Sequence, residues 1–207
     1  MAEIREGSYC GAWILWGRVA LLFAMMLTAP GCMREQDGAR GDEPEQTHLQ
    51  TIEQSKPRVL LFSKTTGYRH ECIPVAVEAL TNALDEDGFQ VVATEDAEAF
   101  SEPSLKRFAV VVFLCTTGDV LNEAEQQAME QYIHGGGGFV GIHSAADTEY
   151  DWPWYGDLVG AYFKSHPKIQ EAEVRVEDRD SISTRHLPER WTRTDEWYNY
   201  RTDPRET

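Results

Sequence analysis

Residues 135–147 read Gly-Gly-Gly-Gly-Phe-Val-Gly-Ile-His-Ser-Ala-Ala-Asp, and this stretch decides the fold. The glycines end a helical pattern, and the apolar run at residues 139–142 predicts a strand. A phosphate-binding loop is excluded, because such loops follow a strand and open a helix, whereas these glycines precede a strand. His143 follows the strand directly, where hydrolase and amidotransferase sheets carry a serine or cysteine nucleophile. Its position predicts a general base, a metal ligand or a hydrogen-bond donor to substrate, and Ser144 is one residue late for a nucleophile.

Strands and helices alternate on the N-terminal side of this stretch. Residues 59–62 (VLLF) and 109–114 (AVVVFL) are continuous apolar runs typical of strands buried on both faces, and residues 89–93 predict another strand. Residues 74–85 and 123–134 have helical periodicity, the second with Asn122 as N-cap. The order predicts βαβ units, and therefore an α/β fold with a mostly parallel sheet covered by helices. We expect the first helix to bury Val75, Ala79, Leu80, Ala83 and Leu84.

In such sheets ligands bind beyond the carboxyl ends of the strands. That rule selects three segments, residues 63–71, 116–119 and 143–147. Their polar side chains belong to Lys64, Tyr68, Arg69, His70, Glu71, Thr116, Thr117, Asp119, His143, Ser144 and Asp147.

Aromatic residues are frequent after Asp147. Trp152 and Trp154 either stack on a sugar, as aromatic faces beside carboxylates commonly do, or fill a core. A further strand is expected at residues 171–176, and the tail at 191–200 (WTRTDEWYNY) places Asp195 and Glu196 among aromatics.

A metal site is a further interpretation. Imidazole and carboxylate suit Zn²⁺ or Mn²⁺, but no close-spaced pair such as H-E-x-x-H identifies the ligands. The candidate ligands are His70, His143, His166, Asp119, Asp147 and Glu196.

The chain of 207 residues has 19 Lys+Arg against 35 Asp+Glu, a net charge of −16. An acidic surface repels phosphate backbones, so nucleic acid is an unfavourable partner and a neutral or cationic ligand fits better. Cys115 ends an apolar run and is interpreted as an inert buried thiol. A Cys72–Cys115 disulfide is the alternative in an oxidising compartment.

Residues 1–32 predict a signal peptide. The apolar run at residues 19–27 is too short to span a bilayer, and Leu-Thr-Ala-Pro-Gly-Cys at 27–32 is similar to a bacterial lipoprotein signal with Cys32 as the acylated residue. Ala29 stands where a large aliphatic residue is usual, so a simple secretory signal or an uncleaved anchor is the alternative. Residues 33–57 predict a disordered polar tether. The domain at 58–207 is therefore expected to be exported, as a periplasmic or cell-surface lipoprotein or a secreted protein.

Several longer motifs carry a family resemblance: residues 62–70 (FSKTTGYRH), 116–121 (TTGDVL), 135–147, 150–155 (YDWPWY), 165–167 (SHP) and 194–200 (TDEWYNY). In this order they resemble the ThuA-like (trehalose utilisation) domain. The resemblance implies the class I glutamine amidotransferase-like fold, a flavodoxin-like three-layer sandwich, with His143 in place of the amidotransferase cysteine. It also implies disaccharide utilisation, including oxidised (3-keto) sugars, and exported members are often labelled secreted glycosyl hydrolases. The site residues it implies are His70, Asp119, His143, Asp147, His166, Asp195 and Glu196.

Two departures accompany the resemblance. Residues 180–184 (DSIST) lack a histidine that the family commonly has, and the family continues past the position of Thr207, so the domain is expected to be truncated at its C-terminus.

The expected function is a glycosyl hydrolase- or lyase-type enzyme acting on a small carbohydrate, with a non-catalytic sugar-binding or accessory domain as the alternative. A glutamine amidotransferase is excluded because no cysteine follows the strand. A homo-oligomer is compatible with the sequence. The expected catalytic residues are His143, His70, Asp147 and Glu196, and the expected substrate-binding residues are Tyr68, Asp119, Trp152, Trp154, His166, Asp195 and Tyr198.

Overall fold

The computed structural model describes residues 56–206 of the chain. The predicted signal peptide, Cys32 and all but the last two residues of the tether lie outside the described residues. Among residues 56–206, no helix is both long enough and apolar enough to cross a membrane.

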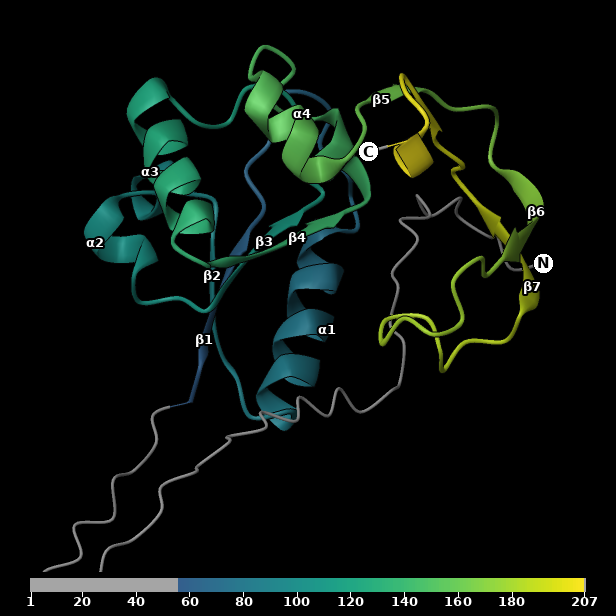
Figure 1. Cartoon of the computed structure of the whole chain (residues 1–207), viewed down its shortest axis with the longest axis horizontal. Helices are drawn as coiled ribbons and strands as arrows, with labels where there is room; N and C mark the ends of the chain where they lie inside the picture. Colours follow the sequence, from purple (N-terminus) through teal and green to yellow (C-terminus); the bar gives the residue numbers. More distant parts are fainter. Residues whose placement is uncertain (1–55, 207) are drawn as a thin grey trace, which may run out of the picture. The chain divides into compact units, whose positions relative to one another are not determined.

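Four parallel strands form the central sheet, in the order β2-β1-β3-β4 (Figure 1). This order matches the flavodoxin-like arrangement of doubly wound folds. The predicted parallel α/β sheet is therefore confirmed. Its strands are β1 (Arg58–Phe62), β2 (Gln90–Thr94), β3 (Val110–Leu114) and β4 (Gly138–Ile142).

Helices cover both faces of the sheet, as Figure 1 shows. Alternate residues of β1 and β3 point to opposite faces, because side chains alternate along a strand. Val59 and Leu61 pack with α1, whereas Leu60 and Phe62 belong to the cluster that contains residues of α2, α3 and α4. The helices are α1 (Ile73–Glu86), α2 (Glu102–Leu105), α3 (Glu123–His134) and α4 (Pro153–Val159), with short 3-10 turns at Ala97–Ala99, His143–Asp147 and Pro204–Glu206.

The buried stripe of α1 differs from the expected one. Ile73 and Ala76 are buried and Leu80 and Leu84 pack beside them, whereas Val75 is 65% exposed. The helix begins one residue earlier than predicted, and Ile73 sets the inward face, which places Val75 on the solvent side. Ala83 is also exposed, so the predicted stripe was wrong at these two positions.

The cysteine interpretation is settled for Cys115, which is fully buried and forms no disulfide. Burial raises the pKa of its thiol to about 12, so it stays protonated and inert at physiological pH. The alternative Cys72–Cys115 disulfide is therefore not formed.

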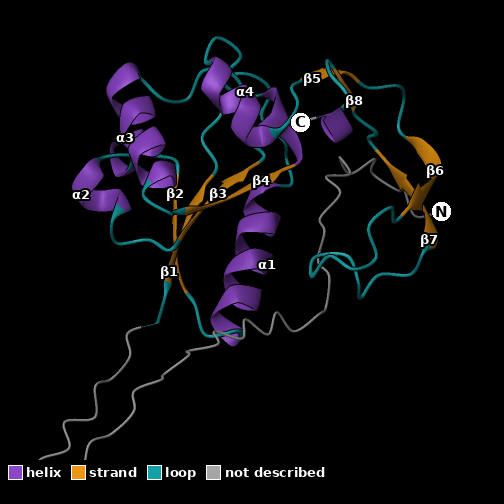
Figure 2. Cartoon of the chain, in the orientation of Figure 1, coloured by secondary structure: helices purple, strands orange, loops and turns teal. Residues whose placement is uncertain are grey.

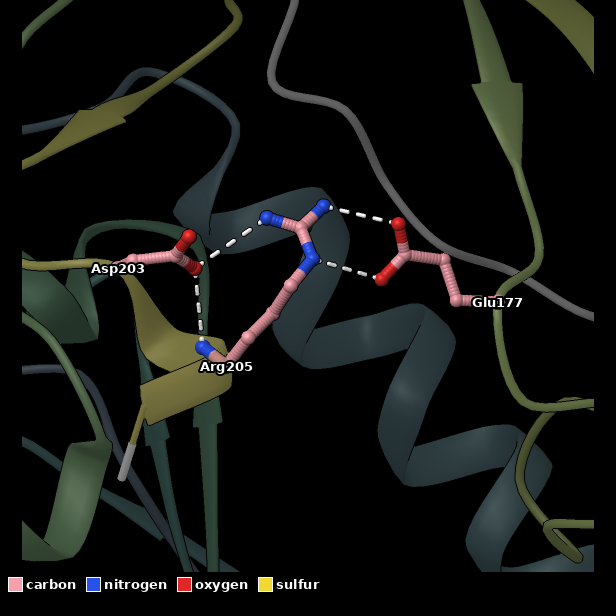
Figure 3. Close-up of polar contacts among 3 residues, drawn as sticks. All are labelled: Glu177, Asp203 and Arg205. Carbon is pink, nitrogen blue, oxygen red and sulfur yellow. Dashed lines mark hydrogen bonds and ion pairs between the residues drawn. The ribbon is translucent and has the colours of Figure 1, made fainter.

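Two short antiparallel pairs follow the sheet. The strand expected at 171–176 is β6 (Gln170–Arg175), and it pairs with β7 (Arg190–Asp195), while β5 (Phe163–Ser165) pairs with β8 (Asn199–Tyr200). Beyond β8, the Arg205 guanidinium donates to both oxygens of Glu177, over 2.8 and 2.9 Å, and also contacts Asp203 (Figure 3). These exposed contacts link the last described residues to the segment that follows β6.

Candidate functional site

The three segments chosen from the sequence lie together at the carboxyl edge of the sheet. The connections after β1 and β3 are loops (Figure 2). In these loops Thr65 pairs with Thr117, and Gly118 pairs with Thr148 beyond β4. The Thr66 amide donates to Thr117 O over 2.9 Å, and the Gly118 amide donates to Asp147 O over 2.9 Å. The loops therefore form one hydrogen-bonded platform.

Gly118 is required for this platform. Its φ is +74°, and a Cβ there would lie 2.4 Å from Thr66 Oγ1. Only glycine permits both the left-handed conformation and the close approach of the two loops.

His143 stands at the sharp turn between β4 and the 3-10 turn that follows. Its φ is +54°, a left-handed conformation that is uncommon outside glycine and that often marks functional positions. Only 13% of its side chain is exposed. The neighbouring Ser144 is fully buried, so its hydroxyl does not face the pocket, which agrees with the weak case for a serine nucleophile.

Three further side chains surround the His143 imidazole. The rings of His70 and His143 meet edge to face with their centroids 4.5 Å apart. Glu196 lies between two imidazoles, with Oε2 3.4 Å from His143 Nε2 and Oε1 3.4 Å from His166 Nε2. The Tyr198 hydroxyl lies 3.5 Å from His143 Nε2.

Burial controls the charge state of this cluster. Desolvation, with the nearby imidazoles of His70 and His166, lowers the pKa of His143 to about 4. Desolvation also lowers the pKa of His70, although the carboxylates of Glu196 and Asp147 oppose the change. Both rings are therefore uncharged at physiological pH and present electron pairs rather than positive charge.

Asp147 lies close enough to affect His70 and Tyr198 electrostatically. Its Oδ1 accepts a 2.5 Å hydrogen bond from the Tyr150 hydroxyl, whose oxygen also lies 3.1 Å from Phe163 O. Desolvation and the adjacent carboxylate raise the pKa of Tyr150, so this phenol remains a donor. Tyr150 was not among the predicted site residues, because nothing in the sequence distinguishes it from the aromatic residues around it.

Glu149 anchors the platform and was also missed. It is 2% exposed, with φ +56°, and its Oε1 accepts from the Val120 and Leu121 amides over 2.7 and 2.8 Å. Its Oε2 accepts from Gln126 Nε2 over 2.7 Å. No sequence signal identifies it, because a lone acidic residue is usually on the surface.

Two other predicted substrate contacts, Tyr68 and Asp195, lie near the cluster. Tyr68 is 64% exposed, and its ring meets that of His70 edge to face. Asp195 lines a pocket together with His143, and its carboxylate contacts Arg193 and accepts from the Glu196 amide. Asp119 is exposed on the platform loop, where its backbone carbonyl accepts from Thr66 Oγ1 over 3.0 Å.

Trp152 and Trp154 are not brought to the cluster. Trp152 is 7% exposed within the core, donates to Glu130 Oε1 over 2.9 Å and stacks on Trp154. This placement fits the core interpretation that the sequence left open.

A pocket of about 340 Å³ opens beside His143. Such a volume is suitable for a small ligand. His143 and the segment after β7 contribute to its wall, together with small residues of β4 and of the turn after it. Among its lining residues are Gly141, His143, Ala145, Asp195, Glu196 and Tyr198.

The fold and the site define a class: a flavodoxin-like α/β protein whose post-strand turn carries a histidine within an imidazole–carboxylate cluster. The family model for ThuA, trehalose utilisation, matches residues 58–207, and the chain belongs to this family. Membership supports a carbohydrate-related role.

Two solved structures are similar to the chain. A putative ThuA-like protein from Bacteroides uniformis is 26% identical, with a TM-score of 0.62, over 82% of this chain and 68% of that chain. A putative ThuA-like protein from Parabacteroides merdae is 19% identical, with a TM-score of 0.59, over 70% of this chain and 63% of that chain, and shows the fold alone. A comparison with curated proteins found no match.

Proposed function

We propose that the chain is a carbohydrate-active enzyme of hydrolase or lyase type that acts on a disaccharide, including one oxidised to a keto-sugar. One observation carries this proposal: His143, His70 and Glu196 converge in front of the carboxyl edge of the sheet, with Asp147 beside them. Family membership supports the carbohydrate part of the proposal. The pocket beside His143 would hold the sugar.

In this proposal, His143 acts through an electron pair. An imidazole with a pKa of about 4 is neutral at physiological pH, so it binds or deprotonates a group rather than delivering a proton. Glu196 and Asp147 supply negative charge on either side, and the exposed Tyr68 ring offers an apolar face to the C–H surface of a sugar.

The test compares turnover of a 3-keto-disaccharide and of its unoxidised form by the full chain and by His143→Asn. Asparagine tolerates the left-handed backbone at this position but removes the imidazole. We expect turnover by the wild type and a loss of at least about 100-fold in kcat for the variant. The exposed residue His186 supplies the matched control, and His186→Ala should retain wild-type turnover.

Binding of the same sugars by calorimetry separates the alternatives. Wild-type turnover that His143→Asn abolishes while sugar binding persists supports an enzyme. A wild type that binds the sugars but turns over neither of them would overturn the enzyme proposal in favour of an accessory domain. Equal turnover by the wild type and His143→Asn would contradict the assignment of this site.

We also propose that the protein is exported and attached to the membrane through a lipid on Cys32. The support is the sequence at residues 19–32, an apolar run followed by small residues and a cysteine. Such a location would place the site where extracellular or periplasmic sugars are met.

A further inference from the structure

The cluster contains the ligand atoms of a metal site. One ligand atom each from His70, His143 and Glu196 lies within 4.8 Å of the other two. They come from the loop after β1, the turn after β4 and the segment after β7, so the tertiary fold alone brings them together. His166, from the connection after β5, also faces Glu196.

His166 contacts the cluster through Glu196. Its Nδ1 lies 2.9 Å from Pro167 O, and a carbonyl oxygen only accepts, so Nδ1 carries a hydrogen. This contact orients the ring with Nε2 toward Glu196 Oε1, 3.4 Å away.

The distances favour the metal ion over a hydrogen bond. Both nitrogen–oxygen separations at Glu196 are 3.4 Å, whereas charge-assisted hydrogen bonds measure about 2.8 Å. Donor atoms around a tetrahedral zinc ion, with bonds of about 2.0–2.1 Å, lie about 3.3 Å apart. The separation between Glu196 Oε2 and His143 Nε2 therefore matches an edge of a coordination tetrahedron.

Neighbouring groups hold two of the ligands in place. The His166 imidazole lies 3.4 Å from Glu196 Oε1. The Glu196 amide donates to Asp195 Oδ1 over 2.9 Å, and Arg193 Nε lies 2.9 Å from Asp195 Oδ2. His143 is fixed by the turn after β4.

We propose that His70, His143 and Glu196 bind one divalent transition-metal ion of the Zn²⁺ type. Two imidazoles and one carboxylate are a ligand set of open Zn²⁺ sites, whose fourth position is left to water or substrate, whereas Ca²⁺ and Mg²⁺ prefer oxygen ligands in larger number. The ion would polarise a sugar carbonyl or hydroxyl oxygen, and only this consequence rests on the proposed function. Metal binding itself is independent of the substrate.

The test uses the full chain, freed of metal with a chelator, and Zn²⁺ alone as the ligand. Calorimetry and elemental analysis after dialysis measure affinity and stoichiometry, and Co²⁺ replacement gives a visible spectrum that reports tetrahedral nitrogen–oxygen coordination. We expect one ion per chain. Glu196→Gln and His70→Ala should each lower the affinity at least about 10-fold, and His186→Ala and His134→Ala, which alter exposed histidines elsewhere, should not.

Circular dichroism of each variant checks that it is folded, and Glu196→Gln, which preserves side-chain size, guards against a simple loss of structure. Absence of stoichiometric Zn²⁺, or equal binding by the wild type and both site variants, would overturn the site. Zn²⁺ binding without sugar turnover would refute the proposed function and leave the site standing. Sugar turnover that survives chelation, in a chain that binds no metal, would refute the metal site and leave the proposed function standing.

Discussion

At the scale of single residues, the backbone of His143 adopts a conformation that favours glycine. Its φ of +54° is adopted freely by glycine, whereas a Cβ makes this region unfavourable by about 1–2 kcal/mol. Glycine should therefore be more favourable than alanine for stability at this position. We expect His143→Gly to be more stable than His143→Ala by about 1 kcal/mol, although glycine normally destabilises relative to alanine. Urea unfolding of the metal-free variants measures this difference, and a more stable His143→Ala would argue against the left-handed turn.

Glu149 provides a prediction about pH. Desolvation raises its pKa, although the bonds from Leu121, Val120 and Gln126 oppose the change. Between the unfolded and the folded pKa, the folded state binds more protons than the unfolded state, so this group's contribution to stability falls as pH rises. Relative to Glu149→Gln, whose amide oxygen still accepts from both backbone amides, the wild type should lose stability as the pH rises above the ordinary carboxyl pKa of 4.5. Unfolding free energies of both proteins across that range test the sign.

Glu149→Ala is the matched control for that comparison. It leaves the Val120 and Leu121 amides without their acceptor, and we expect it to be less stable than Glu149→Gln by about 3 kcal/mol at every pH, because neither variant titrates at this position. A wild type that gains stability over Glu149→Gln as pH rises would contradict the raised pKa.

At the scale of elements, α3 begins with a capping box, of which the sequence analysis predicted the N-cap, Asn122. Asn122 Oδ1 accepts from the Ala124 and Glu125 amides over 3.0 and 3.1 Å, and Glu125 Oε2 accepts from the Asn122 amide over 2.8 Å. We expect Asn122→Ala to reduce the free energy of unfolding by about 1 kcal/mol and Asn122→Asp to preserve it. Thermal and urea unfolding check this, and equal stabilities for the two variants would show that the cap contributes nothing.

The elements were predictable where burial leaves a pattern. Apolar runs identified β1, β3 and β4, and Asn122 gave the start of α3 at the residue observed. The strand β7 was missed, because its half-buried or buried positions include Arg193 and Asp195, which form an ion pair. Polar residues on both faces give no alternation of hydrophobicity to read.

At the scale of the whole molecule, the topology of the sheet predicted the position of only part of the site. The carboxyl-edge rule places His70 and His143 together because each follows a parallel strand. His166 and Glu196 follow strands outside the sheet, β5 and β7, and no periodicity relates them to it. Their place near His143 was indicated only by the chemistry of a possible metal site and by motifs shared with a family.

Attachment of the whole chain to a membrane is the last prediction. The net charge of −16 opposes adsorption to an anionic membrane, so attachment should depend on acyl chains rather than on surface charge. In a bacterial host, the wild type should incorporate labelled fatty acid, sediment with membranes, resist extraction by high salt and dissolve in detergent. Cys32→Ser should carry no label, and Cys10→Ser, which alters the other cysteine of the predicted signal region, should behave as the wild type. Fatty acid on Cys32→Ser, or release of the wild type by salt alone, would exclude Cys32 as the anchor, since an electrostatic contact weakens with ionic strength and an acyl chain does not.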